Sequence, residues 1–297
     1  MRSRDWLLEF EAMFETNPAL PFVLDAVGVF PPSHVHVTTV DEPRPTTPEL
    51  ERLIAVEWER RIREAKANNR LLFNGPMLRY VSHAMRREES GEAHFDLTVG
   101  PTCYRDFVGT NLFNHHRLRE FGWSRFSNPI GTTATIMTGD DLICYGVRSS
   151  RVSYHASHVH TFGGSFEQRD RRPDGTVDPF GSLTREITEE LGLASDELHD
   201  LVCVGLLRDR EIHQPEMLFE TRVALSAEEL RTRWESAESR DEHDGLVTLR
   251  NAPEEIVPFI QTCGQIAPVA IGALMLHGRL SWGHAWFDEA SRRLCGR

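Results

Sequence analysis

The sequence contains few cysteines, and no two of them stand close together. Five cysteines occur among 297 residues, and none belongs to a Cys-x-x-Cys pair. An odd number of widely spaced cysteines in a chain of this length argues against a disulfide framework and favours reduced thiols. Residues 1–14 also lack the apolar core that a secretory signal peptide requires. We therefore expect a cytoplasmic protein.

Long hydrophobic runs and a surplus of positive charge are missing as well. The longest apolar run, residues 266–276, contains Pro268 and is much shorter than the roughly 20 residues of a membrane span. Lys and Arg number 33 against 45 Asp and Glu, so the formal net charge is -12. Nucleic-acid binding needs positive charge to neutralise phosphates, whereas an acidic protein can hold a small phosphorylated ligand through a metal ion. We expect no membrane and no nucleic-acid partner, and the oligomeric state stays open.

The hydrophobic pattern changes its period repeatedly along the chain. Residues 21–40 alternate like a strand, residues 48–68 have the spacing of an amphipathic helix, and further strand-like runs follow. The polar segment 115–130 is broken by Gly and Pro, which is typical of a boundary. We predict an α+β fold with an N-terminal α/β domain over residues 1–118 and a second, sandwich-like domain over residues 119–297.

One predicted helix carries a cluster of acidic side chains. Asp178 fits the N-cap of this helix and Gly192 fits the position just after its end. Between them, Glu186, Glu189 and Glu190 are spaced so that they fall along one helix face. Neighbouring carboxylates repel one another unless a cation lies between them, and Mg²⁺ prefers such oxygen ligands. The alternative is an ordinary solvated acidic surface.

Residues 185–193, REITEELGL, distinguish between these interpretations. They match the second half of the Nudix box, R-E-U-x-E-E-x-G-U, at every fixed position, where U is a bulky aliphatic residue. Gly163 and Gly164, after a strand-like run, resemble the glycine pair that opens the box. The chain is thus similar to the Nudix hydrolase superfamily, and the resemblance implies that the second domain is a Nudix α/β/α sandwich.

The first half of the box departs from the family pattern. The loop between Gly164 and Arg185 is seven residues longer than in the standard box. Val177 occupies the position of the usual glutamate, with Asp178 beside it. Glu167, in the segment GGSFE, could take over part of the missing role.

The lengthened loop after GG-x-x-E resembles one branch of the superfamily, the UDP-glucose/UDP-galactose pyrophosphatases. Residues 71–80, 97–111 and 128–134 also look like that branch. The resemblance implies a nucleoside-diphosphate-sugar diphosphatase that hydrolyses UDP-sugars to UMP and sugar 1-phosphate. It implies Mg²⁺ as cofactor, with Mn²⁺ as an alternative. The N-terminal domain would then recognise the nucleotide.

The resemblance also implies roles for residues of the acidic helix and its surroundings. Arg185 would orient the carboxylates through a planar donor group. The implied metal ligands are the carboxylates of Glu186, Glu189 and Glu190 and the carbonyl of Gly164, with Gly163 as its alternative. For the general base we choose Glu242 in the acidic segment 238–245, which also offers Glu238. Glu186 is an alternative base, and a solvated loop is the alternative interpretation of the segment.

Substrate contacts are predicted in both domains. Arg148 and Arg151 follow a strand before the box and could hold the diphosphate through their planar donors. Nucleoside contacts are predicted for aromatic and polar residues of one N-terminal segment, namely Tyr104, Asp106, Thr110 and Asn111, with Asn74 and Arg79 as secondary candidates. Each of these could instead serve a local turn or a core hydrogen bond.

Two other functions stay open at this point. One is a Nudix hydrolase of ADP-ribose or another nucleoside diphosphate derivative. The other is a Nudix-fold module that binds a ligand without turnover, against which the intact Arg185, Glu186, Glu189 and Glu190 argue. A transition-metal site at His155, His158 and His160 is not predicted, because a strand does not complete their ligand set.

Overall fold

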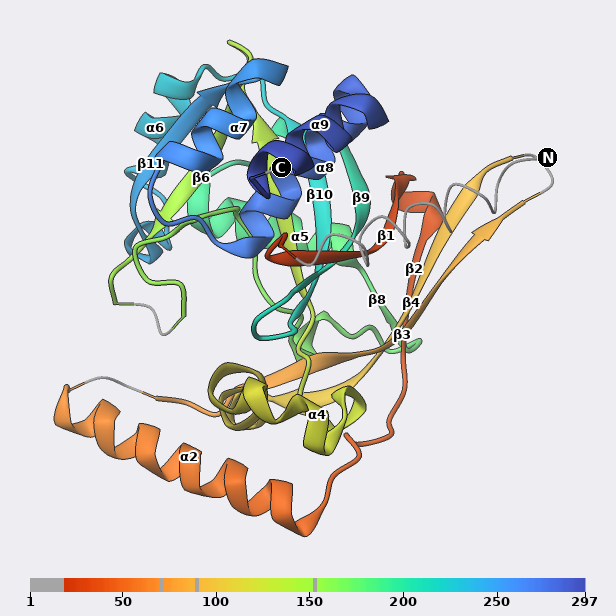
Figure 1. Cartoon of the computed structure of the whole chain (residues 1–297), viewed down its shortest axis with the longest axis vertical. Coiled ribbons are helices and arrows are strands. Elements are labelled where there is room, and N and C mark those ends of the chain that lie inside the picture. Colours follow the sequence, from red (N-terminus) through yellow and green to blue (C-terminus); the bar gives the residue numbers. More distant parts are fainter. Residues whose placement is uncertain (1–18, 70–71, 89–90, 152–153, 297) are drawn as a thin grey trace.

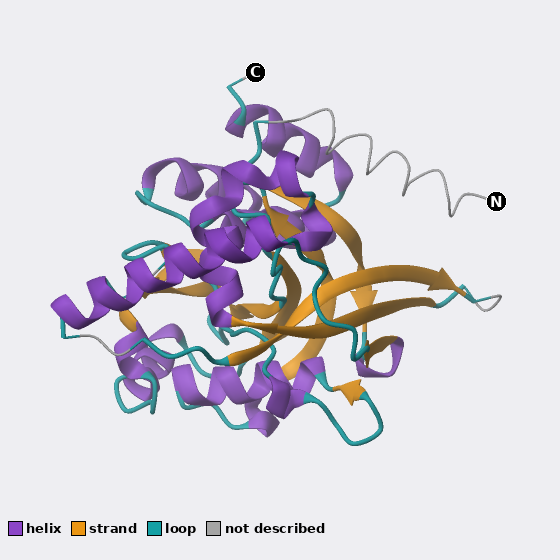
Figure 2. Ribbon diagram, turned by 90° about the horizontal axis from the view of Figure 1, so that it is seen from below, coloured by secondary structure: helices purple, strands orange, loops and turns teal. Residues whose placement is uncertain are grey.

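The computed structural model describes residues 19–69, 72–88, 91–151 and 154–296. Within these ranges the chain folds into two β-sheets with helices around them (Figures 1 and 2). Residues 1–14, for which we predict no signal-peptide core, lie outside the described residues. Among the described helices, none combines the length and the apolar character needed to cross a membrane.

The larger sheet has seven strands, and four of them begin or finish at the same end of the sheet. Its path runs β1 (Phe22–Phe30), β9 (His199–Asp209), β10 (Pro215–Arg222), β5 (Gly131–Met137), β6 (Leu142–Arg148) and β11 (His243–Arg250), and β7 (Val159–His160) pairs with β6. β10 and β5 are parallel, with Glu216 opposite Gly131, whereas β9 and β6 run antiparallel to them. The starts of β5 and β10 therefore lie beside the ends of β6 and β9.

Helices cover both faces of this sheet. On one face, apolar residues of α5 (Pro179–Leu191) and α6 (Ala227–Trp234), including Leu183 and Leu230, share a core with Leu206 of β9. On the other face, Leu207 packs with α8 (Pro268–Trp282) and α9 (His284–Leu294), beside α7 (Pro253–Thr262). Successive residues of a strand point to opposite faces, so one strand serves both cores. The predicted α/β/α sandwich is confirmed.

The smaller sheet has four strands, in the order β3 (Pro76–Arg87), β4 (Ala93–Cys103), β2 (Val35–Thr39) and β8 (Thr176–Val177). β3 and β4 form a long hairpin that extends away from the rest of the chain (Figure 1). Leu78, Phe95 and Leu97 on this sheet belong to the same core as α5. Helix α2 (Pro48–Ala67) and the short helices α3 (Tyr104–Phe107) and α4 (Leu118–Phe121) complete this part of the chain.

The two sheets exchange strands across the predicted domain boundary. β1 comes from the N-terminal segment but pairs with β9 of the larger sheet. β8 comes from the segment after residue 118 but pairs with β2 of the smaller sheet. The division at residue 118 stays a prediction, and the observed sheets show that the segments on its two sides share strands and a core.

Local sequence signals agree with the first strands and the first helix of the described chain. The helix predicted over residues 48–68 is α2, whose N-cap Thr47 accepts a hydrogen bond from the Leu50 N–H at 3.2 Å. Residues 21–40, which look strand-like in sequence, form two strands, β1 and β2, in different sheets. Pro31 and Pro32 interrupt the run, because proline fixes φ and has no N–H to donate.

Candidate active site

Helix α5 begins and ends as its sequence predicts, and this fixes which face carries the acids. Asp178 accepts a hydrogen bond from the Gly181 N–H at 2.9 Å, and Gly192 ends the helix with φ +70°. Leu183, Ile187 and Leu191 are fully buried in the core. The helical period then places the glutamates beside this apolar stripe, toward the end of the larger sheet where the four strand termini meet.

The glycine pair Gly163–Gly164 fits against the acidic face of α5. The buried carboxylate of Glu190 accepts a hydrogen bond from the Gly163 N–H at 2.9 Å. A Cβ on Gly164 would lie 2.6 Å from the Glu186 carboxylate, which is closer than real contacts allow. The Gly164 carbonyl, predicted as a metal ligand, accepts the Thr132 N–H at 2.8 Å. The two halves of the motif therefore meet as the sequence pattern indicates.

Arg185 holds two of the helix carboxylates. Its guanidinium donates to Glu186 at 2.6 Å and lies 3.7 Å from Glu189. It also donates to Asp170 at 3.0 Å, a buried partner in the lengthened loop that our sequence interpretation missed. Glu167, the expected substitute, pairs instead with Arg169 at 2.8 Å. The sequence signal for Asp170 was its place three residues after Glu167, where its carboxylate accepts the Glu167 N–H.

A cavity of about 430 Å³ opens beside α5, at the same end of the larger sheet. Its lining comes from both predicted domains and includes Tyr104, Arg148, Gly164, Glu186, Glu216 and Glu242. A second hollow shares Tyr104 and Glu186 with the first and adds the exposed ring of Phe73. Tyr104 therefore faces the space in front of the acidic helix.

Glu242 reaches this cavity because its loop is fastened to α5. The Ser239 N–H donates to the Glu189 carbonyl at 2.8 Å, and the Ser149 N–H donates to the Glu242 carbonyl at 2.8 Å. Burial of the carboxylate in the cavity wall raises the pKa of Glu242, and the charge of Glu189 raises it further. Part of the residue is exposed, so its carboxylate stands between solvent and the site.

The carboxylates of the site oppose one another's ionisation. Burial raises the pKa of Glu190 well above its usual range, and the negative charge of Glu242 adds to this effect. Burial likewise raises the pKa of Glu186, against the attraction of Arg185. Hard oxygen donors that resist ionisation when no cation is near fit a divalent ion such as Mg²⁺. Glu186 and Glu190 therefore fit the metal that the motif implies, and Glu186 is the helix glutamate that lines the cavity.

Arg148 lies among acidic groups at the end of β6. Burial lowers its pKa, while the charges of Glu190, Glu242 and Glu216 act in the opposite direction. Its buried Nε has no hydrogen-bond partner in the described part of the chain. A buried donor without a partner is costly, and because Arg148 lines the cavity, its guanidinium is placed to pair with a phosphate group there.

Other predicted substrate residues lie elsewhere. Asp106 is paired with Arg44 at 2.8 Å, and the Thr110 hydroxyl donates to the Asp106 carbonyl at 2.6 Å. Asn111 is fully buried and donates to the Asn128 side chain and the Ile212 carbonyl. None of Asp106, Thr110 and Asn111 is among the lining residues of the cavity, and their contacts support a structural role.

Arg151 and the secondary candidates Asn74 and Arg79 are also not among the residues that line the cavity. Arg151 is exposed and lies 3.4 Å from Asp241. The Asn74 side chain accepts the Arg105 N–H at 2.8 Å, and Arg79 donates to the Glu42 carbonyl at 3.1 Å. These substrate assignments stay predictions that the observed contacts do not favour.

Two acidic residues that the sequence did not single out, Asp209 and Glu216, also line the cavity. Asp209, at the end of β9, accepts the Tyr154 hydroxyl at 3.1 Å and lies 3.6 Å from the His155 Nε2. Burial raises the pKa of Glu216, at the start of β10, to about 8. The available signal was a charged residue at the end of an apolar strand, which is costly to bury without a role.

The chain is similar in sequence to Nudix proteins. No family model matches it. It is 27% identical over 237 residues to Nudix hydrolase 9 of Arabidopsis thaliana, which covers 68% of this chain and 72% of that protein. It is 24% identical over 249 residues to the human uridine diphosphate glucose pyrophosphatase NUDT22, covering 76% of this chain and 81% of that protein. The resemblance to the Nudix hydrolases is confirmed by these relatives.

Among solved structures, similarity is found to a NUDIX-family hydrolase from Clostridium perfringens. The TM-score is 0.32 and the identity 11%, and the match covers 52% of this chain and 98% of that one.

Proposed function

We propose that this protein is a Nudix diphosphatase that hydrolyses the diphosphate bond of UDP-sugars, giving UMP and sugar 1-phosphate with Mg²⁺ as cofactor. The observation that carries the proposal is the meeting of Glu186, Arg148 and Glu242 in one cavity beside α5. The similarity to a uridine diphosphate glucose pyrophosphatase over 76% of this chain supports the choice of substrate.

The helix carboxylates supply the metal ligands. Glu186, Glu189 and Glu190 would hold Mg²⁺, which when bound supplies positive charge that neutralises phosphate oxygens and eases attack by water. Arg185 orients Glu186 through its 2.6 Å hydrogen bond. Glu190 is fixed by the Gly163 N–H, so its carboxylate keeps one position while substrate enters.

The remaining groups act on substrate and water. Arg148, which lines the cavity, would donate to the diphosphate oxygens. Glu242 would accept the proton of the attacking water as the new phosphorus–oxygen bond forms and the bridging bond to the leaving phosphate breaks. Tyr104 would stack on the nucleobase from the N-terminal side of the cavity.

A substrate panel tests this proposal. The purified protein is incubated with Mg²⁺ and UDP-glucose, UDP-galactose, ADP-ribose or a dinucleotide, and the products are separated and identified. We expect UMP and sugar 1-phosphate, and loss of turnover in the Glu189→Gln, Glu190→Gln double variant. A Glu238→Gln variant serves as the acidic control. Activity confined to ADP-ribose would overturn the substrate, full activity of the double variant would overturn the metal ligands, and binding without turnover would support a ligand-binding module.

A further inference from the structure

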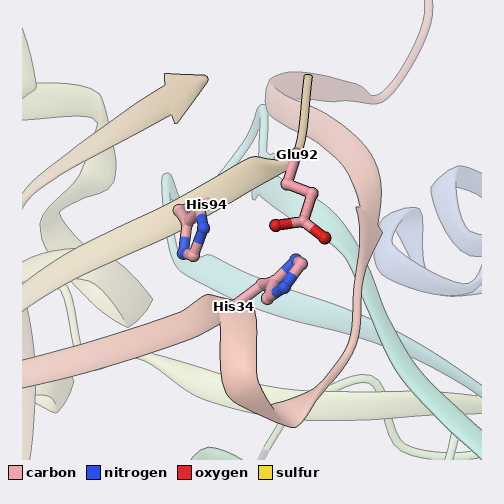
Figure 3. A group of neighbouring side chains, drawn as sticks. All are labelled: His34, Glu92 and His94. Carbon is pink, nitrogen blue, oxygen red and sulfur yellow. The ribbon is translucent and has the colours of Figure 1, made fainter. Parts of the chain in front are cut away.

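We propose that His34, Glu92 and His94 form a second metal site, suited to a transition-metal ion such as Zn²⁺, on the smaller sheet. One ligating atom from each of the three residues lies within 4.8 Å of the other two. Within the described part of the chain this is the group of His, Cys, Asp and Glu side chains that gathers in this way. Figure 3 shows the Glu92 carboxylate beside the neighbouring imidazole rings of His34 and His94.

Strand register brings these residues together. β2 and β4 are parallel, with Val35 opposite Phe95. His34 and His94 immediately precede this pair, so they also lie side by side, and their ring centroids are 4.4 Å apart. Glu92 stands two residues before His94, and residues two apart in an extended chain point to the same face. The arrangement is thus a consequence of backbone pairing and of alternation along the strands.

The two faces of this sheet have opposite character. Val35 and Phe95 point into the main core. On the other face, His36 follows His34 and stacks near His94, with ring centroids 5.7 Å apart. His34, His36 and His94 therefore gather on the face of the sheet opposite the main core.

His94 provides the strongest sign that a ligand belongs here. Its residue is only 9% exposed, and neither ring nitrogen has a hydrogen-bond partner among the described residues. Glu88 Oε1 lies 3.2 Å from its Nε2 without the geometry of a hydrogen bond. A buried imidazole nitrogen without a hydrogen bond is costly, and coordination of a metal would satisfy one of the two ring nitrogens.

The donor set selects the kind of ion. Two imidazoles and one carboxylate are ligands that Zn²⁺ accepts in tetrahedral sites, leaving a fourth position for water or for Glu88. Mg²⁺ instead prefers oxygen ligands alone. The two sites therefore differ in chemistry: oxygen donors at α5 and mainly nitrogen donors at the smaller sheet. A bound ion would connect the turn before β2 to the start of β4.

Cobalt substitution separates the two sites experimentally. Apo-protein in a large excess of Mg²⁺, which occupies the carboxylate site, is titrated with Co²⁺ and its visible d–d absorption is recorded. Zn²⁺ is then added to displace Co²⁺, and bound Zn²⁺ per chain is counted after dialysis. The variants are His34→Ala, Glu92→Gln and His94→Asn, and the control is His116→Ala, which removes an exposed histidine outside the cluster.

We expect one tightly bound Zn²⁺ per chain and intense tetrahedral Co²⁺ bands in the wild type and in His116→Ala. His34→Ala and Glu92→Gln should weaken Zn²⁺ binding at least tenfold while their circular dichroism and diphosphatase activity stay as in the wild type. Because His94 is buried, its variant is interpreted only if it folds, and the other two carry the test. Absence of Zn²⁺ binding by the wild type, or unchanged binding by His34→Ala and Glu92→Gln, would overturn the proposal.

Discussion

The carboxylate of Glu190 and the backbone N–H of Gly163 are joined by a hydrogen bond of 2.9 Å. This contact links residues that are 27 positions apart and connects the glycine pair to the acidic helix. Gly163 can make it because its backbone has φ +144°, a conformation that residues with a Cβ rarely adopt. The hydrogen bond keeps a buried carboxylate satisfied next to the cavity.

We expect Gly163→Ala to destabilise the fold. Its Cβ would lie 2.0 Å from the Thr132 carbonyl oxygen, and its φ would be strained. A loss of roughly 2 kcal/mol or more in the free energy of unfolding follows from these two effects. The matched control is Gly245→Ala, where nothing lies within 4 Å of the added Cβ. Urea denaturation compares them, and equal midpoints for the two variants would contradict the steric argument.

The acidic helix could be predicted because its signals are local. Asp178, Gly192 and the spacing of Glu186, Glu189 and Glu190 specify a capped helix with one acidic face, whatever the rest of the chain does. The smaller sheet could not be predicted in this way. The residues of β1 and β2 are similar, and only their distant partners decide that they enter different sheets.

The same distinction explains which site residues were missed or misplaced. Asn111 has the chemistry of a nucleotide ligand, but its partners Asn128 and Ile212 lie 17 and 101 positions away and use its donors internally. Asp170 and Asp209 reach the site through a loop and a strand end whose positions depend on the whole fold. Residue type indicates what a side chain can bond, and only the tertiary structure decides what it does bond.

Tyr104 and Asn111 should separate substrate binding from folding. Tyr104→Phe keeps the ring at the cavity and should leave KM near the wild-type value, whereas Tyr104→Ala should raise KM for UDP-sugars because the stacking surface is lost. Asn111→Ala should instead lower the free energy of unfolding by about 2 kcal/mol, because it leaves buried groups unpaired. Steady-state kinetics and denaturation of all three variants check this. A folded Asn111→Ala protein with a raised KM would restore Asn111 as a substrate ligand.

Glu216 should make stability depend on pH. Its pKa is raised by burial to about 8, above the ordinary value of 4.5, so the folded state retains a proton that the unfolded state releases. Between these two pKa values stability falls as pH rises, since the unfolded state then binds fewer protons. Without divalent metal, the free energy of unfolding should decrease from pH 5 to pH 8 by about 1 kcal/mol or more. In Glu216→Gln this part of the decrease should disappear, and parallel curves for the two proteins would contradict the assignment.

Glu242 should control the rate of hydrolysis and its dependence on pH. Glu242→Gln removes the proton acceptor while preserving size, so kcat should fall about 10²- to 10⁴-fold with little change in KM. In the wild type, burial raises the pKa of Glu242. As pH falls through that value the carboxylate gains a proton, so kcat should decline at a pH above the usual glutamate range. Rates measured from pH 4 to 9 at saturating Mg²⁺ define this acidic limb of the kcat–pH profile. The Glu238→Gln variant should show the same limb. If Glu242→Gln retained both the rate and the limb, the proton acceptor would have to be Glu186, whose pKa is also raised by burial.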